Sequence, residues 1–307
     1  MLASIDIGTN TIRCLVVSSG KDVLTPKYVD VKIIRLGENF MKEGVITEAS
    51  ILRLKDALNH YSKKIEEFGI KRDEVAVAGT SVLRDAPNAK DILEYIRKEF
   101  GFNVRIISGE KEALVTLAGI ASCFGNLKEF YALDIGGGST EYACFKSGRP
   151  LWKYSLNMGV VHLTEGVVKS DPVSSYDLSK MEEYIDNNLN SLKRRILKSG
   201  YKFEPLNLLG TAGTATTLAM VDLELGIYDR LKVHGYVLKK RNIGKIYKKF
   251  IGKKAFERLN ITGVEKGRED LVLAGTAIML KSMNFFGTDS LTVSECGLLE
   301  GLIGYNI

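Results

Sequence analysis

Short apolar runs alternate with longer amphipathic stretches along the chain. Residues 130–133 form an apolar run of strand length, and residues 104–107 are expected to form a short strand. Residues 47–68 instead carry apolar side chains at helical spacing, and Thr47 stands where a capping residue is expected. Strands that alternate with helices predict an α/β fold. The expected helices cover residues 47–68, 91–100, 108 to about 123, and about 177–199.

The polar stretch at residues 134–141 separates two apolar runs, which predicts a hairpin with a glycine-rich tip. Three consecutive glycines allow positive φ angles and bring backbone N–H groups close to a phosphate. Asp134 and Glu141 flank the turn, so a bound anion needs a divalent cation beside it. A plain glycine hairpin is the alternative. The candidate phosphate-binding residues here are Gly136, Gly137, Gly138 and Ser139.

The same pattern occurs 128 residues earlier, where Asp6, Gly8 and Thr11 align with Asp134, Gly136 and Ser139. A repeat half a chain away indicates two related domains. We expect an N-terminal domain at 1–125, joined by a C-terminal helix at 294–307, and a C-terminal domain at 126–293. Two such hairpins facing one another would form a phosphate clamp in a cleft between the domains. The candidate residues in this copy are Gly8, Thr9, Asn10 and Thr11.

A third glycine and hydroxyl turn lies within residues 206–218, between an apolar run and a predicted helix. The first amides of a helix lack intrahelical partners, so Gly210, Thr211 and Gly213 are candidate phosphate or nucleotide ligands. A small-residue turn that permits close packing is the alternative.

Composition is that of a globular protein of two domains, with 307 residues, 45% hydrophobic and 26% charged. The four cysteines are scattered without a C-x-x-C pair, which favours reduced thiols, a cytoplasmic location and no structural zinc site. Asp6 interrupts the first apolar stretch and no apolar run reaches membrane-spanning length, so neither secretion nor membrane spanning is expected. The net charge of +6 favours anionic partners.

Residues 232–258 form the most basic stretch of the chain. Such a run is usually a solvated helix face, and the alternative is a track for a long polyanion. Aromatic residues are sparse within it, so nucleic-acid binding is not expected.

Six stretches of the chain match the motifs of one known family, and they are residues 5–11, 79–86, 108–113, 134–141, 210–214 and 294–302. On these stretches the chain resembles the exopolyphosphatase and guanosine pentaphosphate phosphohydrolase family, a branch of the actin, sugar-kinase and heat-shock-chaperone ATPase superfamily. The resemblance implies two ribonuclease-H-like (actin-like ATPase) domains with an interdomain active site, in the short form without extra C-terminal domains.

Carried over residue by residue, the resemblance implies Glu112 as the catalytic base and Asp134 and Glu141 as Mg²⁺ ligands. It also implies Arg13 in the cleft, Arg84 near the terminal phosphate and Arg268 on a guanosine polyphosphate. Two positions depart from the family pattern. Lys111 stands where a second acid is common and Leu114 where an arginine is common, so substrate contacts near this helix are expected to differ.

The function that this resemblance implies is Mg²⁺-assisted release of the terminal phosphate of inorganic polyphosphate by water that Glu112 activates. Guanosine pentaphosphate is the alternative substrate, and the basic stretch slightly favours polyphosphate. A kinase of the same superfamily and a non-catalytic sensor of guanosine tetraphosphate are alternatives of other classes. No membrane partner is expected, and a homodimer is left open.

Overall fold

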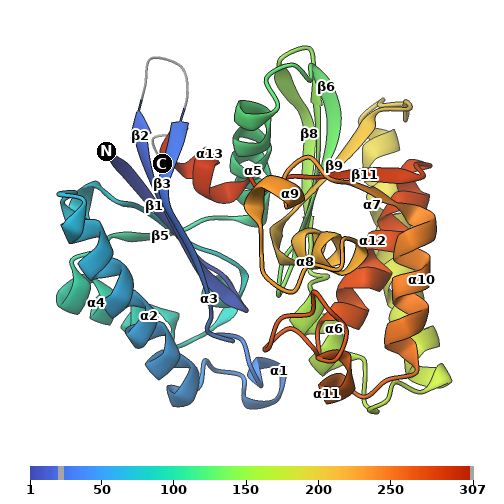
Figure 1. Cartoon of the computed structure of the whole chain (residues 1–307), viewed down its shortest axis with the longest axis horizontal. Helices are drawn as coiled ribbons and strands as arrows, with labels where there is room; N and C mark the ends of the chain where they lie inside the picture. The colour runs from blue at the N-terminus through green and yellow to red at the C-terminus, as the bar shows by residue number, and fades with distance from the viewer. Residues whose placement is uncertain (20–23, 305–307) are drawn as a thin grey trace. The chain divides into compact units, whose positions relative to one another are not determined.

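A computed structural model describes residues 1–19 and 24–304 of the chain. The chain divides into two compact units, here called unit 1 (residues 1–124 and 296–307) and unit 2 (residues 125–295). Figure 1 labels their helices and strands. None of the described helices combines the length and the apolar character that crossing a membrane requires.

Unit 1 is built on a five-stranded sheet with the order β3-β2-β1-β4-β5. β1, β2 and β3 form two antiparallel hairpins, whereas β4 and β5 run parallel to β1. The strands are β1 (Leu2–Ile7), β2 (Thr11–Ser19), β3 (Leu24–Ile33), β4 (Ala76–Gly79) and β5 (Val104–Ile106).

The helices of unit 1 cover both faces of this sheet. Successive residues of β2 point to opposite faces of the sheet. Cys14 and Val16 pack in the core with α2 and α4, whereas Leu15 and Val17 pack beside Leu299 of α13. Thr47 caps α2 as expected, accepting the N–H of Ser50. The helices are α1 (Phe40–Glu43), α2 (Glu48–Glu67), η1 (Arg72–Glu74), α3 (Ser81–Asp85), α4 (Ala89–Phe100), α5 (Gly109–Cys123) and α13 (Leu298–Gly304).

Unit 2 repeats this plan. Its sheet has the order β10-β11-β9-β6-β7-β8. Five of these strands, taken in the spatial order β8-β7-β6-β9-β11, correspond in order and direction to β3-β2-β1-β4-β5 of unit 1. β10 adds an antiparallel edge. The strands are β6 (Glu129–Ile135), β7 (Thr140–Lys146), β8 (Arg149–Leu156), β9 (Asn207–Thr211), β10 (Val237–Lys239) and β11 (Ser290–Val293).

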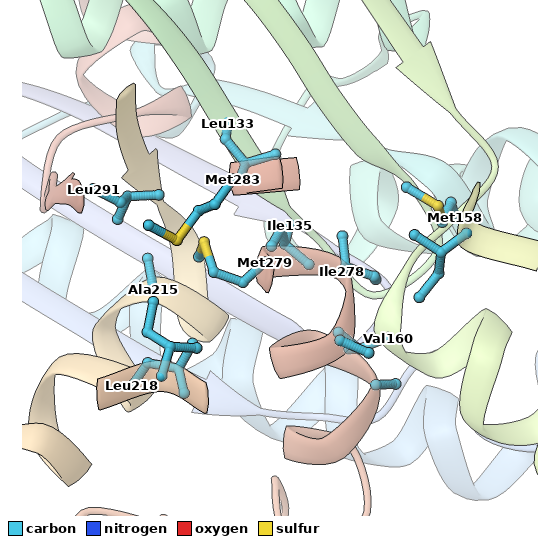
Figure 2. Close-up of a cluster of buried hydrophobic side chains, with 14 of the residues drawn as sticks. Leu133, Ile135, Met158, Val160, Ala215, Leu218, Ile278, Met279, Met283 and Leu291 are labelled. Carbon is cyan, nitrogen blue, oxygen red and sulfur yellow. The ribbon is translucent and has the colours of Figure 1, made fainter. Parts of the chain in front are cut away.

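A large hydrophobic core lies within unit 2. Figure 2 shows part of it, where Leu133 and Ile135 of β6 meet Met279 and Met283 of α12. The α/β prediction is therefore confirmed in both units. The helices are α6 (Val160–Gly166), α7 (Ser175–Lys198), α8 (Ala212–Asp222), α9 (Arg230–Val233), α10 (Lys240–Ile251), α11 (Ala255–Arg258) and α12 (Val272–Phe286).

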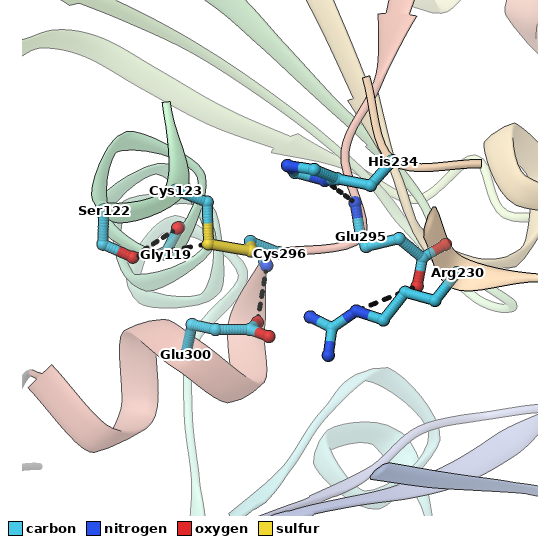
Figure 3. Close-up of a disulfide and its surroundings, with 9 residues drawn as sticks. Gly119, Ser122, Cys123, Arg230, His234, Glu295, Cys296 and Glu300 are labelled. Carbon is cyan, nitrogen blue, oxygen red and sulfur yellow. Dashed lines mark hydrogen bonds and ion pairs between the residues drawn. A yellow bond between two sulfur atoms is a disulfide. The ribbon is translucent and has the colours of Figure 1, made fainter. Parts of the chain in front are cut away.

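The expectation that all cysteines are reduced is wrong for one pair. Cys123, at the end of α5, and Cys296 form a disulfide with a Cα–Cα distance of 6.4 Å (Figure 3). Cys14 and Cys144 are free and buried, and burial raises their pKa values to about 12 and about 11. The paired cysteines are 173 residues apart, so their spacing in the sequence gave no sign of the bond.

The C-terminal helix is shorter than the expected 294–307. α13 begins at Leu298, and the Glu300 carboxylate accepts the N–H of Gly297 just before it. Residues 305–307 lie outside the described residues.

Candidate active-site residues

The turn between β1 and β2 is held by its own backbone. Gly8 donates its N–H to the Thr11 carbonyl at 2.9 Å, and the carbonyls of Thr9 and Asn10 accept amides of residues 34–37. Across residues 1–19 and 24–304, no hydrogen bond is recorded for the N–H groups of Thr9 and Asn10. Two backbone donors therefore remain for a ligand.

The turn between β6 and β7 repeats this arrangement. Gly136 donates its N–H to the Ser139 carbonyl at 3.0 Å, and the carbonyls of Gly136 and Gly137 accept amides from the start of α6. Within the described chain the N–H groups of Gly137 and Gly138 likewise have no recorded acceptor. The equivalence of the two turns thus extends from sequence to hydrogen bonding, and successive free amides suit an anion.

The β6–β7 turn packs closely against Gly159, the residue just before α6. A Cβ on Gly159 would lie 2.2 Å from the Gly137 carbonyl oxygen, so only glycine permits this approach. α6 therefore holds the carbonyl side of the β6–β7 turn in place.

The charged residues beside the two turns differ. Asp6 is opposite Arg13 in the ladder, and both Nε and Nη2 of Arg13 donate to Asp6 Oδ2, at 2.9 and 2.6 Å. The equivalent pair in unit 2 is Asp134 opposite Glu141, which are 6% and 2% exposed. Ser155 Oγ donates to Glu141 Oε1 at 2.7 Å. One turn thus has an ion pair where the other has two buried acids.

Glu112 and Arg84 meet in unit 1. Ser108 caps α5 by accepting the N–H of Lys111, and Glu112 follows in the first turn. Arg84 Nη1 donates to Glu112 Oε2 at 2.7 Å and to the Ile107 carbonyl at 3.0 Å. The side chains of Arg84 and Glu112 are 18% and 11% exposed, so this ion pair is largely buried. An arginine from another helix therefore orients Glu112.

The β9–α8 junction of unit 2 contains the third predicted turn. A Cβ on Gly213 would lie 1.9 Å from Arg268 Nη1, so the guanidinium of Arg268 rests on this glycine. Arg268 Nε donates to Glu265 Oε2 at 2.8 Å. Gly210 lies inside β9, where a Cβ would meet Leu291. Close packing therefore explains Gly210, whereas Thr211 and Gly213 stand at the start of α8.

Each unit gathers its candidate residues at the carboxyl ends of its parallel strands. In unit 1 the Thr80 N–H donates to the Ile7 carbonyl, and the Val82 N–H to Thr9 Oγ1, which ties the start of α3 to the turn. In unit 2 the β6–β7 turn and the start of α8 follow the paired ends Asp134 and Thr211. Ligands commonly bind at this edge of parallel sheets.

Three residues that bond to candidate site residues were not predicted from the sequence, namely Asp6, Ser155 and Glu265. Asp6 could have been identified from the sequence, because it aligns with Asp134. Among the described residues, Asp6 Oδ1 and Asn10 Oδ1 are buried acceptors without a hydrogen-bond donor. The described parts of the chain hold no group of three or more His, Cys, Asp or Glu side chains placed to bind a metal.

Comparison with known proteins gives consistent results. A model of the Ppx/GppA phosphatase family matches residues 15–306. The bifunctional 3-dehydroquinate synthase/phosphatase of Fusobacterium nucleatum is 33% identical over 98% of the chain, which spans 46% of that longer protein. Exopolyphosphatase 2 of Mycobacterium tuberculosis is 28% identical, with 98% of the chain and 97% of that protein covered.

A solved structure confirms the expected fold. The crystal structure of the Ppx/GppA family member from Aquifex aeolicus superimposes with a TM-score of 0.80 at 32% identity, covering 98% of this chain and 95% of that one. Together with the duplicated strand order, this likeness supports two ribonuclease-H-like domains.

Proposed function

Because the chain belongs to the Ppx/GppA phosphatase family, we propose that it releases the terminal phosphate of inorganic polyphosphate. The observation that carries the proposal is the pair of equivalent turns, each with two free backbone amides. One turn has a buried pair of carboxylates beside it. This combination suits a phosphate whose charge is shared with a cation.

Asp134 and Glu141 fit a divalent cation such as Mg²⁺. They oppose one another on neighbouring strands, where like charges destabilise the sheet. Mg²⁺ is typically bound by one or two carboxylates together with waters and substrate phosphates, so two acids suffice. The cation would neutralise phosphate charge.

Glu112 is the proposed general base. Glu112 is 8% exposed as a residue, and its carboxylate is held by Arg84, so it can accept a proton from the attacking water in a fixed orientation. Arg84 would also neutralise charge on the terminal phosphate, and Arg13 charge on the phosphate bound at the first turn. Phosphoryl transfer depends mainly on such positioning and charge neutralisation.

Guanosine pentaphosphate remains the second candidate substrate. The observation that favours it is the contact between the Arg268 guanidinium and Gly213, which places a positive charge at the start of α8. A guanidinium beside the N-terminal amides of a helix suits a further phosphate group.

Phosphate release from long-chain polyphosphate and from guanosine pentaphosphate, with and without Mg²⁺, tests the proposal. We expect Mg²⁺-dependent release, and we expect Glu112→Gln to reduce turnover by about 10²–10⁴, the range for a lost general base. Glu110→Gln is the matched control, because Glu110 is exposed in the same helical turn. Full turnover by Glu112→Gln would remove the assignment of the base, and binding without phosphate release would favour a sensor.

A further inference from the structure

The positive charge of this protein is concentrated in one segment. The chain carries 43 Lys and Arg against 37 Asp and Glu. Residues 237–256 contain eight of these basic residues and no acid, so the remainder of the chain has two more acids than bases. The net charge of +6 thus comes from this segment alone.

The segment is centred on α10, whose two faces differ. Ile243, Ile246 and Phe250 are buried, and α10 packs on α12 and α8 of unit 2 (Figure 1). Its exposed residues recur at intervals of three and four, so they share the opposite face. We call this set the basic stripe, and it consists of Arg241, Lys245, Lys248 and Lys249.

Neighbouring acids are engaged elsewhere. Asp222 accepts hydrogen bonds from Tyr236 and Asn242, and Glu182 accepts from Tyr247 and pairs with Lys281. Asp289 pairs with Lys240, outside the stripe. In the described part of the chain, no ion pair to a carboxylate is found for any residue of the basic stripe.

The placement of these cations opposes helix stability. Arg241 stands in the first turn of α10, which has no acid, although a helix N-terminus favours negative charge. Arg241 and Lys245, and Lys245 and Lys249, are like-charged pairs four residues apart, which destabilise a helix. A bound anion would relieve both effects.

We propose that the basic stripe binds linear polyphosphate. It would hold the part of the polyphosphate polymer that is remote from the phosphate being hydrolysed. The inference rests on the proposed function. From Arg241 to Lys249 the stripe is about 12 Å long, so it presents several cations to a polymer with a charge on every phosphate.

Single-stranded nucleic acid fits this surface less well. Its binding normally adds base stacking on exposed aromatic rings. Phe250 is buried in the core, and Tyr247 is half-buried with its hydroxyl bonded to Glu182. Phe256 is exposed, but it lies beyond the end of α10.

The test compares two triple variants. Lys245→Gln/Lys248→Gln/Lys249→Gln removes most of the basic stripe while glutamine keeps the helix propensity of lysine. The control Lys193→Gln/Arg194→Gln/Lys198→Gln removes three exposed charges from α7 of the same unit. Circular dichroism checks that both variants fold. Equilibrium binding of long-chain polyphosphate is measured in EDTA over a range of salt concentrations.

We expect the stripe variant to bind long-chain polyphosphate roughly tenfold to a hundredfold more weakly, and its log–log salt slope to be smaller by about 2. The control should bind like the wild type. In hydrolysis, the KM for long-chain polyphosphate should rise at unchanged kcat. The KM for tripolyphosphate should change much less, because three phosphates offer the basic stripe far fewer charges than a long polymer does.

Unchanged binding by the stripe variant, or equal weakening in the control, would overturn the inference. So would a single-stranded oligonucleotide that binds as tightly as polyphosphate with the same dependence on the three lysines. If binding depends on the stripe but the wild type releases no phosphate, the inference stands and the proposed hydrolysis fails.

Discussion

At the scale of single residues, Ala212 has an unfavourable backbone conformation beside a candidate site. Its φ of 65° lies in the left-handed region, which residues other than glycine rarely occupy. Ala212 is the first residue of α8, between Thr211 and Gly213. Strain of this kind tends to occur at functional sites, where the surrounding structure maintains it.

Ala212→Gly should therefore stabilise unit 2 by about 0.5–1 kcal/mol, because glycine adopts this conformation without a steric penalty. Urea unfolding followed by the fluorescence of Trp152, the single tryptophan of the chain, measures the change. Ala215→Gly, in the same helix at a buried position with ordinary geometry, should instead lower stability by about 1 kcal/mol. A lower midpoint for Ala212→Gly would contradict the strain.

At the scale of elements, α5 and α13 approach so closely that glycines are required at their contact. A Cβ on Gly119 would lie 1.8 Å from the Gly297 carbonyl oxygen, and one on Gly301 would lie 2.0 Å from the Val115 carbonyl oxygen. α5 begins with the turn that carries Glu112. The fit against α13 therefore fixes the helix that positions the proposed base.

Gly301→Ala should destabilise unit 1 by about 1–3 kcal/mol, because the methyl group collides with backbone that cannot move away cheaply. Amide hydrogen exchange in α5 measures the loss, and exchange should accelerate. Gly304→Ala is the control in the same helix, since a Cβ there meets no described atom within 4 Å. Equal exchange rates in the two variants would show that the contact between α5 and α13 accommodates the added methyl group without loss of stability.

At the scale of the whole molecule, unit 1 is assembled from two segments of the chain. The first segment ends at Phe124 and the second begins at Cys296. The Cys123–Cys296 disulfide joins residues beside both of these points and so encloses the entire unit 2 sequence in a covalent loop (Figure 3). A crosslink across so long a loop restricts the unfolded chain strongly.

Reduction of this disulfide should lower the free energy of global unfolding by about 2–5 kcal/mol. Chemical denaturation followed by circular dichroism, with and without a dithiol reductant, measures the effect. Cys123→Ser should match the reduced wild type and should not respond to the reductant. An identical midpoint for the oxidised and reduced wild type would show that the bond contributes little.

The local features of this protein follow from its sequence. The spacing of hydrophobic residues predicts the helices and strands, and Thr47 caps a helix where the capping rules place it. The repeat of Asp6 to Thr11 at Asp134 to Ser139 predicts two related units, and the matching turn hydrogen bonds agree with it. These features depend on residues close together in the chain, so the sequence alone is enough to reveal them.

Only the tertiary structure decided which distant residues meet. Arg84 pairs with Glu112 across 28 positions, Arg268 rests on Gly213, and Cys123 bonds to Cys296. Residue type gave no sign of these partners, because each contact depends on how separate strands and helices pack. The positive charge of α10 is evident in the sequence. That the basic stripe forms no ion pair with the neighbouring acids among the described residues depends on how the adjacent helices pack.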